Sequence, residues 1–271
     1  MTSRGRSLPD FDNPPAVETL MGVYFLPIKG WKVPHFGMFW ERIRADYPTV
    51  EVRTPIIAGP PGKSPGLRIP SPEEEINLPV RCWFHNRNKE TLVQVQDSCF
   101  FQNWRRESNS LQYLHYDSLR PTFEHEWQKF HDFVEQEDLG TPNVWRCEVT
   151  YVNHIDRGLG WNTYDDLSQV FLEPPGQAFA RSFLPAPDSV SFHLAYPMDG
   201  AEGQLQIQMQ PVVRKTDSRD TIQLTVTASC RPASGETEII VSSLNQAREW
   251  VVKGFTEFTS PKMHQLWGRR I

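Results

Sequence analysis

Two runs in the last third of the chain alternate strictly between polar and apolar residues. Residues 204–210 read Gln-Leu-Gln-Ile-Gln-Met-Gln, and residues 221–228 read Thr-Ile-Gln-Leu-Thr-Val-Thr-Ala. A period of two places the apolar side chains on one face of a strand and the polar ones on the other. The charged residues 214–220 between the runs suit a hairpin loop. The pattern therefore predicts a β-hairpin whose apolar face must be covered by another element.

Three other stretches have the apolar spacing of amphipathic helices. Residues 34–46 predict a short helix that opens with proline, which helices favour at their first position. Residues 121–139 predict a long helix with an aromatic stripe. The last helix is expected to begin at Ser243, which has the spacing of a capping box with Gln246, and to break at Pro261.

The remaining apolar runs predict further strands. They are expected over residues 16–28, 49–53, 79–84, 91–96, 100–106, 143–156 and 189–196, with a short helix over 165–171. Residues 16–28 are fairly apolar on both faces, which indicates a central strand. Prolines and glycines crowd residues 56–76, which predicts a long irregular surface loop.

The order of these elements repeats along the chain. Each half has a long strand, a short helix, strands that end in a hairpin, and a long amphipathic helix. We therefore expect an α+β fold of two related halves, residues 16–140 and 141–271, after a flexible lead over residues 1–15. Each half would be a curved, mainly antiparallel sheet covered by its own C-terminal helix. One continuous domain, with a coincidental echo, is the alternative.

The composition is that of a soluble globular protein. The 271 residues are 38% hydrophobic and 23% charged, with a mean hydropathy of -0.52. No apolar run is long enough to cross a bilayer, and the first residues lack the apolar segment of a secretory signal. We expect a cytoplasmic protein with no membrane partner. The net charge of -5 argues against a general nucleic-acid coat and still permits a local basic groove.

Catalytic and metal-binding motifs are weak. The four cysteines are far apart, so we expect reduced thiols and neither a metal site nor a cofactor. Two His-x-Asp pairs, His115 with Asp117 and His154 with Asp156, can place an imidazole beside a carboxylate if they lie in strands. Local hydrogen bonding at strand ends is the favoured explanation of both pairs. The chain has neither the zinc-protease spacing HExxH nor the glycine-rich phosphate motifs GxGxxG and GxxxxGK[ST].

The most suggestive polar cluster is Asn103-Trp104-Arg105-Arg106. A tryptophan between arginines can stack on a base while the guanidinium groups neutralise phosphates. The same residues can also act as a structural staple at a sheet edge. Four further arginines would join the cluster if the fold brings them close: Arg42, Arg44, Arg81 and Arg87.

Four short marks are spread along the chain. Residues 13–18 read Asn-Pro-Pro-Ala-Val-Glu, 103–105 Asn-Trp-Arg, 151–155 Tyr-Val-Asn-His-Ile, and 266–268 Leu-Trp-Gly. In this order and spacing they resemble a sporadically distributed family of uncharacterised bacterial proteins. The resemblance implies a stand-alone cytoplasmic bacterial protein and supplies no activity and no catalytic residue. Its patchy distribution is typical of accessory genes, including those of defence.

These observations favour a non-enzymatic binding or interaction protein with a broad aromatic surface edged by arginines. Its partner would be another protein or a second copy of itself, and a local Arg/Trp patch would also suit nucleic acid. The candidate binding residues are Asn103, Trp104, Arg105, Arg106, His115, Asn153 and His154. Asn153 is also expected to close a turn.

Two alternatives are retained. The first is a hydrolase acting on a nucleotide or nucleic acid, with Arg105, Arg106, His115 and His154 lining one cleft. The second is a small-ligand binder with a cavity between the sheet and the last helix.

Overall fold

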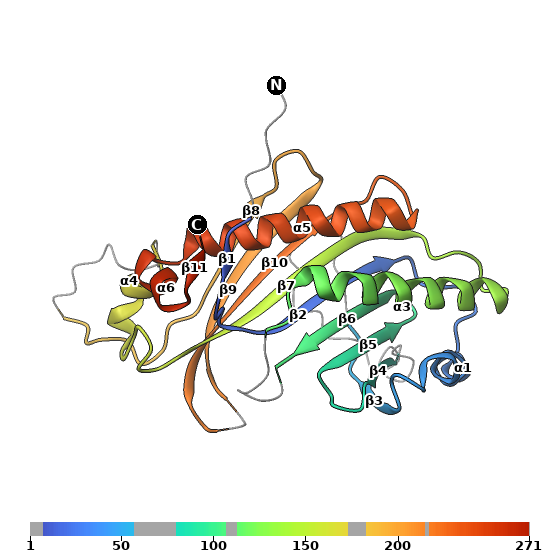
Figure 1. Ribbon diagram of the computed structural model, residues 1–271, viewed down its shortest axis with the longest axis horizontal. Coiled ribbons are helices and arrows are strands. Elements are labelled where there is room, and N and C mark those ends of the chain that lie inside the picture. Colours follow the sequence, from blue (N-terminus) through green and yellow to red (C-terminus); the bar gives the residue numbers. More distant parts are fainter. Residues whose placement is uncertain (1–7, 57–79, 107–112, 173–182, 215–216, 271) are drawn as a thin grey trace.

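The computed structural model describes residues 8–56, 80–106, 113–172, 183–214 and 217–270. These residues form one large sheet with helices packed on it (Figure 1). The loop expected over residues 56–76 lies outside the described residues from residue 57 onward, as do residues 1–7 of the expected flexible lead.

The sheet has nine strands, and each pair of neighbours is antiparallel. The strands are β2 (Ala16–Phe25), β3 (Thr49–Arg53), β4 (Arg81–His85), β5 (Thr91–Gln96), β6 (Cys99–Arg105), β7 (Val144–Asp156), β8 (Phe192–Pro197), β9 (Gly203–Val213) and β10 (Asp220–Cys230). Their order across the sheet is β3-β4-β5-β6-β2-β7-β10-β9-β8. The central position expected for the first long strand is therefore confirmed.

The predicted hairpin is also confirmed. Strands β9 and β10 pair along their whole length, with Leu205 opposite Ala228 and Ile207 opposite Val226. The apolar members of both strands are buried and the glutamines lie on the opposite face, as the period of two requires.

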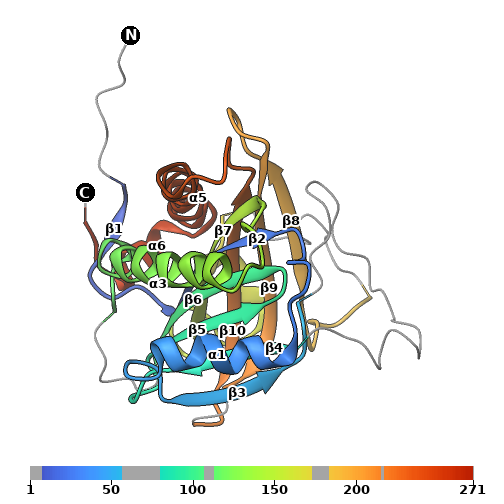
Figure 2. The same ribbon diagram turned by 90° about the vertical axis from the view of Figure 1, so that its right-hand side faces the viewer.

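Six helical segments accompany the sheet in the described part of the chain: α1 (Val33–Ile43), α3 (Tyr116–Gln136), the 3-10 turn η1 (Tyr164–Asp166), α4 (Leu167–Val170), α5 (Thr237–Phe258) and α6 (Pro261–Leu266). The two long helices, α3 and α5, lie on the same face of the sheet (Figures 1 and 2). Helix α3 packs on β6 and β2, whereas α5 packs on β7 and β10. No helix in the described ranges is long and apolar enough to span a membrane.

An aromatic layer fills the space between α3 and the sheet. Phe100 of β6 contacts Phe123, Trp127 and Phe130 of α3, with ring centroids 6.0, 5.5 and 5.2 Å away. All four side chains are buried. Because aromatic rings bury a large apolar area, this layer is a major source of stability for this part of the fold.

Both long helices begin earlier than their expected starts. Helix α3 begins at Tyr116 rather than near Pro121, because buried Tyr116 and Leu119 extend the apolar stripe by more than a turn. Helix α5 begins at Thr237, so the capping box expected at Ser243 is wrong. The Ser243 hydroxyl instead donates to the carbonyl of Ile239 at 2.9 Å, a bond made inside a helix.

The segment just before β2 is part of the fold and not a flexible lead. Asp10 and Phe11 form strand β1, which pairs with Arg269 and Arg270 of β11. Phe11 is buried against Phe255 and Trp267, at centroid distances of 5.7 and 6.2 Å. Strands β1 and β11 therefore bring the two ends of the described chain together, and Phe11 packs them against α5.

The prediction of an α+β fold with a mainly antiparallel sheet is confirmed. The sheet is continuous through the middle of the molecule, because β2 and β7 pair with each other. The four cysteines are buried and form no disulfide.

Candidate functional site

The two faces of the sheet differ in chemistry. The first face carries the apolar side chains on which α3 and α5 pack. The second face carries the alternate residues, including Trp83, Asn103 and Gln223. Over β9 and β10 this second face is lined by glutamine and threonine, whereas over β3 to β6 it carries arginines, glutamines and Trp83.

Three arginines surround the indole of Trp83. The guanidinium carbons of Arg53, Arg105 and Arg81 lie 4.5, 4.6 and 5.4 Å from its ring centroid. Arg53 belongs to β3, Arg81 to β4 and Arg105 to β6, so the sheet itself brings them together. We call Arg53, Arg81, Trp83 and Arg105 the Trp83 cluster.

The carboxylates of the described residues do not fully compensate the positive charge of the Trp83 cluster. Arg53 forms an ion pair with Glu51, and Arg105 forms one with Glu18 at 3.1 Å. Among the described residues, no carboxylate pairs with Arg81, whose Nη1 donates to the amide oxygen of Gln94 at 2.9 Å. Burial, and then repulsion from Arg53 and Arg105, lower the pKa of Arg81. A guanidinium still keeps its charge at neutral pH.

A chain of hydrogen bonds fixes the cluster in place. Gln94 accepts from Arg81 and donates from Nε2 to Asn103 Oδ1 at 2.6 Å. Asn103 donates in turn to the Glu18 carboxylate, which also accepts from Arg105 Nε at 3.1 Å. The chain crosses β4, β5, β6 and β2. Because Gln94 and Asn103 are buried, the chain holds Arg81 and Arg105 in fixed positions.

Several polar atoms at the cluster are buried without a hydrogen-bond partner in the described part of the chain. They include Arg81 Nε, Trp83 Nε1 and both ring nitrogens of His85. His85 lies with its Nε2 3.5 Å from Glu51, and burial lowers its pKa below the ordinary value for histidine. Buried donors without acceptors are rare in folded proteins, which sets these atoms apart from the rest of the sheet.

Strand alternation divides the predicted Asn103–Arg106 cluster. Asn103 and Arg105 lie on the second face within the network just described, whereas Trp104 points to the first face and is buried. The Arg106 guanidinium lies 5.9 Å from the Trp104 ring. Of the further arginines considered, Arg81 joins the cluster.

Arg42 and Arg44 make other ion pairs. Arg42 contacts Glu137 at 3.3 Å, and Arg44 contacts Glu41 at 2.8 Å. Neither arginine contacts Trp83.

The described residues do not bring His115 and His154 together. His115 lines a cavity of about 50 Å³ on the first face, beside Asn153. His154 lies on the second face, where its Nε2 is 3.4 Å from Gln223 Oε1. The sheet separates the two imidazoles, so they do not share the cleft expected for a hydrolase. Asn153 does not close a turn either: it lies inside β7, and its Nδ2 donates to the carbonyl of Leu224 at 3.1 Å.

Neither His-x-Asp pair forms a hydrogen bond between its own members among the described contacts. Asp117 pairs with Arg248 at 3.6 Å, and His115 lies 3.7 Å from Asp10. Asp156 instead accepts two hydrogen bonds of 2.9 Å from Arg214. The carboxylates therefore serve ion pairs and do not orient an imidazole base.

The aromatic surface expected for a protein partner is not formed by the tryptophans. All nine lie in described residues, and each is buried or half-buried. Most of the surface of the tryptophan side chains is therefore buried within the fold.

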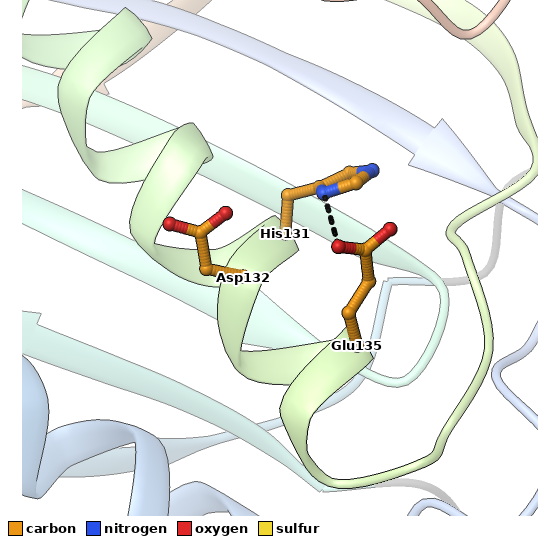
Figure 3. A group of neighbouring side chains, drawn as sticks. All are labelled: His131, Asp132 and Glu135. Atoms are coloured by element: carbon orange, nitrogen blue, oxygen red, sulfur yellow. Dashed lines mark ion pairs between the residues drawn. The ribbon is translucent and has the colours of Figure 1, made fainter.

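One group on α3 has metal-ligating side chains close together (Figure 3). The ligand atoms of His131, Asp132 and Glu135 lie within 4.8 Å of one another. His131 forms an ion pair with Glu135 at 3.8 Å, while Asp132 accepts a hydrogen bond from Gln128 at 2.8 Å. These contacts are those of a solvated helix surface.

Sequence reasoning missed Arg53, Trp83, Gln94 and Glu18 as partners of Asn103 and Arg105. The alternation within residues 81–85 places Arg81, Trp83 and His85 on one face, and this was the available signal. Comparisons with protein-family models, with curated proteins and with solved structures find no match.

Proposed function

We propose that the protein is a non-enzymatic binding protein whose ligand carries a phosphate group, bound at the Trp83 cluster. The observation that carries this proposal is the positive charge of Arg81, which lies between Arg53 and Arg105 and has no carboxylate partner among the described residues. Guanidinium groups bind phosphate through paired, charge-assisted hydrogen bonds. Three guanidinium groups around the Trp83 ring match a phosphate, which has three or four acceptor oxygens, better than they match a carboxylate, which has two.

The ligand contacts the cluster through its charge and not by base stacking. The guanidinium groups of Arg53 and Arg105 lie within 4.6 Å of the Trp83 centroid, in the space that a stacked base needs. A free polyphosphate and the backbone of a nucleic acid are the two sources of such a group. The fixed network through Gln94 and Asn103 supports binding, since the donors need little reordering when an anion arrives.

We also infer that the two halves of the chain are related. The strand order supports this inference, because the strands on the two sides of the central pair, β2 and β7, are arranged in the same way. From β2 the order is β6, β5, β4, and from β7 it is β10, β9, β8. In each direction the outer strands precede the inner ones in sequence, and a long helix follows the last strand. Superposition tests this inference: related halves align strand for strand, with α3 on α5.

Calorimetric titration at low salt tests the proposed ligand. Inorganic pyrophosphate and a single-stranded oligonucleotide are the probes, and a poly-glutamate peptide is the carboxylate comparison. Replacing Arg81 by Gln removes the surplus charge, so affinity for the phosphate probes should fall about tenfold or more. The control is Arg231→Gln, since Arg231 is an exposed arginine paired with Glu202 at 3.5 Å, outside the cluster.

The probes also separate the sources of phosphate. Tighter binding of the oligonucleotide, with a steep loss on adding salt, identifies a nucleic-acid backbone, whereas equal binding of pyrophosphate identifies a free phosphate compound. Failure of both phosphate probes, an unchanged affinity in the Arg81→Gln protein, or preference for poly-glutamate would overturn the proposal.

A further inference from the structure

A groove lies on the first face of the sheet, between the second half of α5 and strands β8 and β9. Its volume is about 810 Å³, within the range of sites that hold small molecules. Figure 1 shows α5 running along this end of the sheet. The groove is on the opposite face from the Trp83 cluster, so it is independent of the proposed phosphate site.

Apolar side chains form the floor and part of the walls of the groove. Leu205 and Ile207 of β9 form its buried floor, and Tyr196, Trp250 and Phe258 contribute aromatic walls. Tyr196 is 40% exposed, although it lies on the face that the helices cover elsewhere. The end of the sheet at β8 therefore keeps aromatic area that α5 does not cover.

Gly254 brings α5 close to the floor at one point and leaves no side chain there. A Cβ on Gly254 would lie 2.5 Å from Leu205 Cδ2. Phe258, one turn further along α5, packs on Phe171 and Phe192, with centroid distances of 5.2 and 5.7 Å. The helix thus approaches β9 at Gly254, and one turn later Phe258 lines the groove while its ring is held by Phe171 and Phe192.

The charged residues at the groove are mainly acidic. Lys253 is paired with Glu249 on the adjacent turn of α5. Asp199 and Glu257 also line the groove, and neither forms an ion pair with any described residue. Within the described part of the chain, Asp199 and Glu257 are therefore two carboxylates beside aromatic rings without a cationic partner.

We propose that this groove binds a small organic cation with an apolar body, such as a hydrophobic quaternary ammonium ion. The apolar body would cover Leu205 and Ile207, which gains burial of apolar surface. The cationic head would lie between the rings of Tyr196 and Trp250 and the carboxylates of Asp199 and Glu257. Aromatic faces and acidic groups together favour such cations over neutral or anionic molecules of equal size.

Three probes that share a naphthylmethyl body test this site on the whole chain by calorimetry: naphthylmethyl-trimethylammonium, its neutral isostere neopentylnaphthalene, and anionic naphthylacetate. The cation should bind about tenfold more tightly than the neutral isostere, and the anion more weakly than both. The Trp250 indole N–H resonance should shift on addition of the cation, which locates it in the groove. Failure of all three probes, or binding of the anion at least as tightly as the cation, would overturn the inference.

The matched variant replaces Asp199 by Asn and Glu257 by Gln, which removes both charges and keeps the side-chain size. Its affinity for the cation should fall about tenfold, while that for the neutral isostere stays unchanged. The control is Glu238→Gln, an exposed carboxylate in the first turn of the same helix. Unchanged cation binding in the double variant would contradict the assigned role of the carboxylates. The probe comparison in the unmodified protein tests the site even if a variant fails to fold.

Discussion

Arg53 and Arg81 lie directly opposite each other on the antiparallel strands β3 and β4. Like charges in this position destabilise a strand pair, and both guanidinium groups also lie over the ring of Trp83. Arg105 adds a third positive charge from the other side of β5. Such an arrangement is expected to cost stability in the free protein, and an anion bound as proposed would relieve the repulsion, which links the geometry to the proposed function.

The first prediction concerns this repulsion. Arg81→Gln should raise the free energy of unfolding by about 0.5 kcal/mol at low salt, because it removes one of the opposed charges. The difference should shrink as potassium chloride is added, since salt screens charges near the surface. Urea unfolding at two ionic strengths measures both effects. Arg44→Gln is the control, because Arg44 is exposed and already paired with Glu41. A loss of stability at low salt in the Arg81→Gln protein would show that packing on Trp83 outweighs repulsion.

The second prediction concerns the close approach of β2 and β6 at Gly22. A Cβ on this residue would lie 2.1 Å from Phe101 Cδ1 and 2.4 Å from the carbonyl oxygen of Phe100. Gly22→Ala should therefore lower the free energy of unfolding by about 3 kcal/mol, through displacement of Phe101 and the strand beside it. Urea unfolding measures the loss.

Gly37→Ala is the matched control for Gly22. Gly37 lies inside α1, where a Cβ would meet no atom within 4 Å. Alanine favours a helix over glycine, so this change should raise stability by roughly 0.5–1 kcal/mol. Similar effects at the two glycines would contradict the steric argument.

The third prediction concerns His264 in α6. Its Nε2 is 2.9 Å from Thr259 Oγ1, and its Nδ1 is 3.2 Å from Arg269 Nη1. The Thr259 hydroxyl donates to the carbonyl of Phe255 at 2.7 Å, so it accepts from Nε2. Nδ1 must then accept from Arg269, which requires a neutral ring. Burial, and then the Arg269 charge, lower the pKa of His264 in the folded protein.

The sign of the pH effect follows from this lowered pKa. Between the folded pKa and the ordinary value near 6.5, the unfolded chain binds the proton and the folded one does not. The contribution of His264 is therefore present above pH 6.5 and is lost as the pH falls toward the folded pKa. His264→Gln should make the slope of stability against pH shallower in this window, and Arg269→Gln should do so to a smaller extent. An unchanged slope in the His264→Gln protein would contradict the assignment.

The fourth prediction concerns the ion pair between Arg214 and Asp156. Arg214 donates two hydrogen bonds of 2.9 Å to Asp156, and their side chains are only 16% and 11% exposed. Arg214→Ala leaves a nearly buried carboxylate with one cation fewer, so the free energy of unfolding should fall by roughly 3 kcal/mol. Arg219→Ala should change it by less than about 0.5 kcal/mol, because Arg219 is 62% exposed and 3.6 Å from the same carboxylate. Equal losses, measured by urea unfolding, would contradict this ranking.

Local patterns in the sequence predict most of the helices and strands, and the two wrong helix starts have a common cause. The alternation in residues 204–210 and 221–228 predicted β9 and β10 because period two is a property of neighbouring residues. The starts of α3 and α5 lie before the predicted starts at Pro121 and Ser243. Proline and serine are typical of helix starts, but here the burial of Leu119 and Ile240 extends each helix further.

The sequence by itself determined which residues share a face of each strand, and therefore that Asn103 and Arg105 lie apart from Trp104 once residues 99–105 form a strand. Only the tertiary structure decided which strands are neighbours. Arg53, Arg81 and Arg105 come from β3, β4 and β6, and no local period records that these strands lie near one another. Strand neighbours are chosen by the packing of the whole sheet under its helices, and so a site assembled across strands appears only when the sheet is complete.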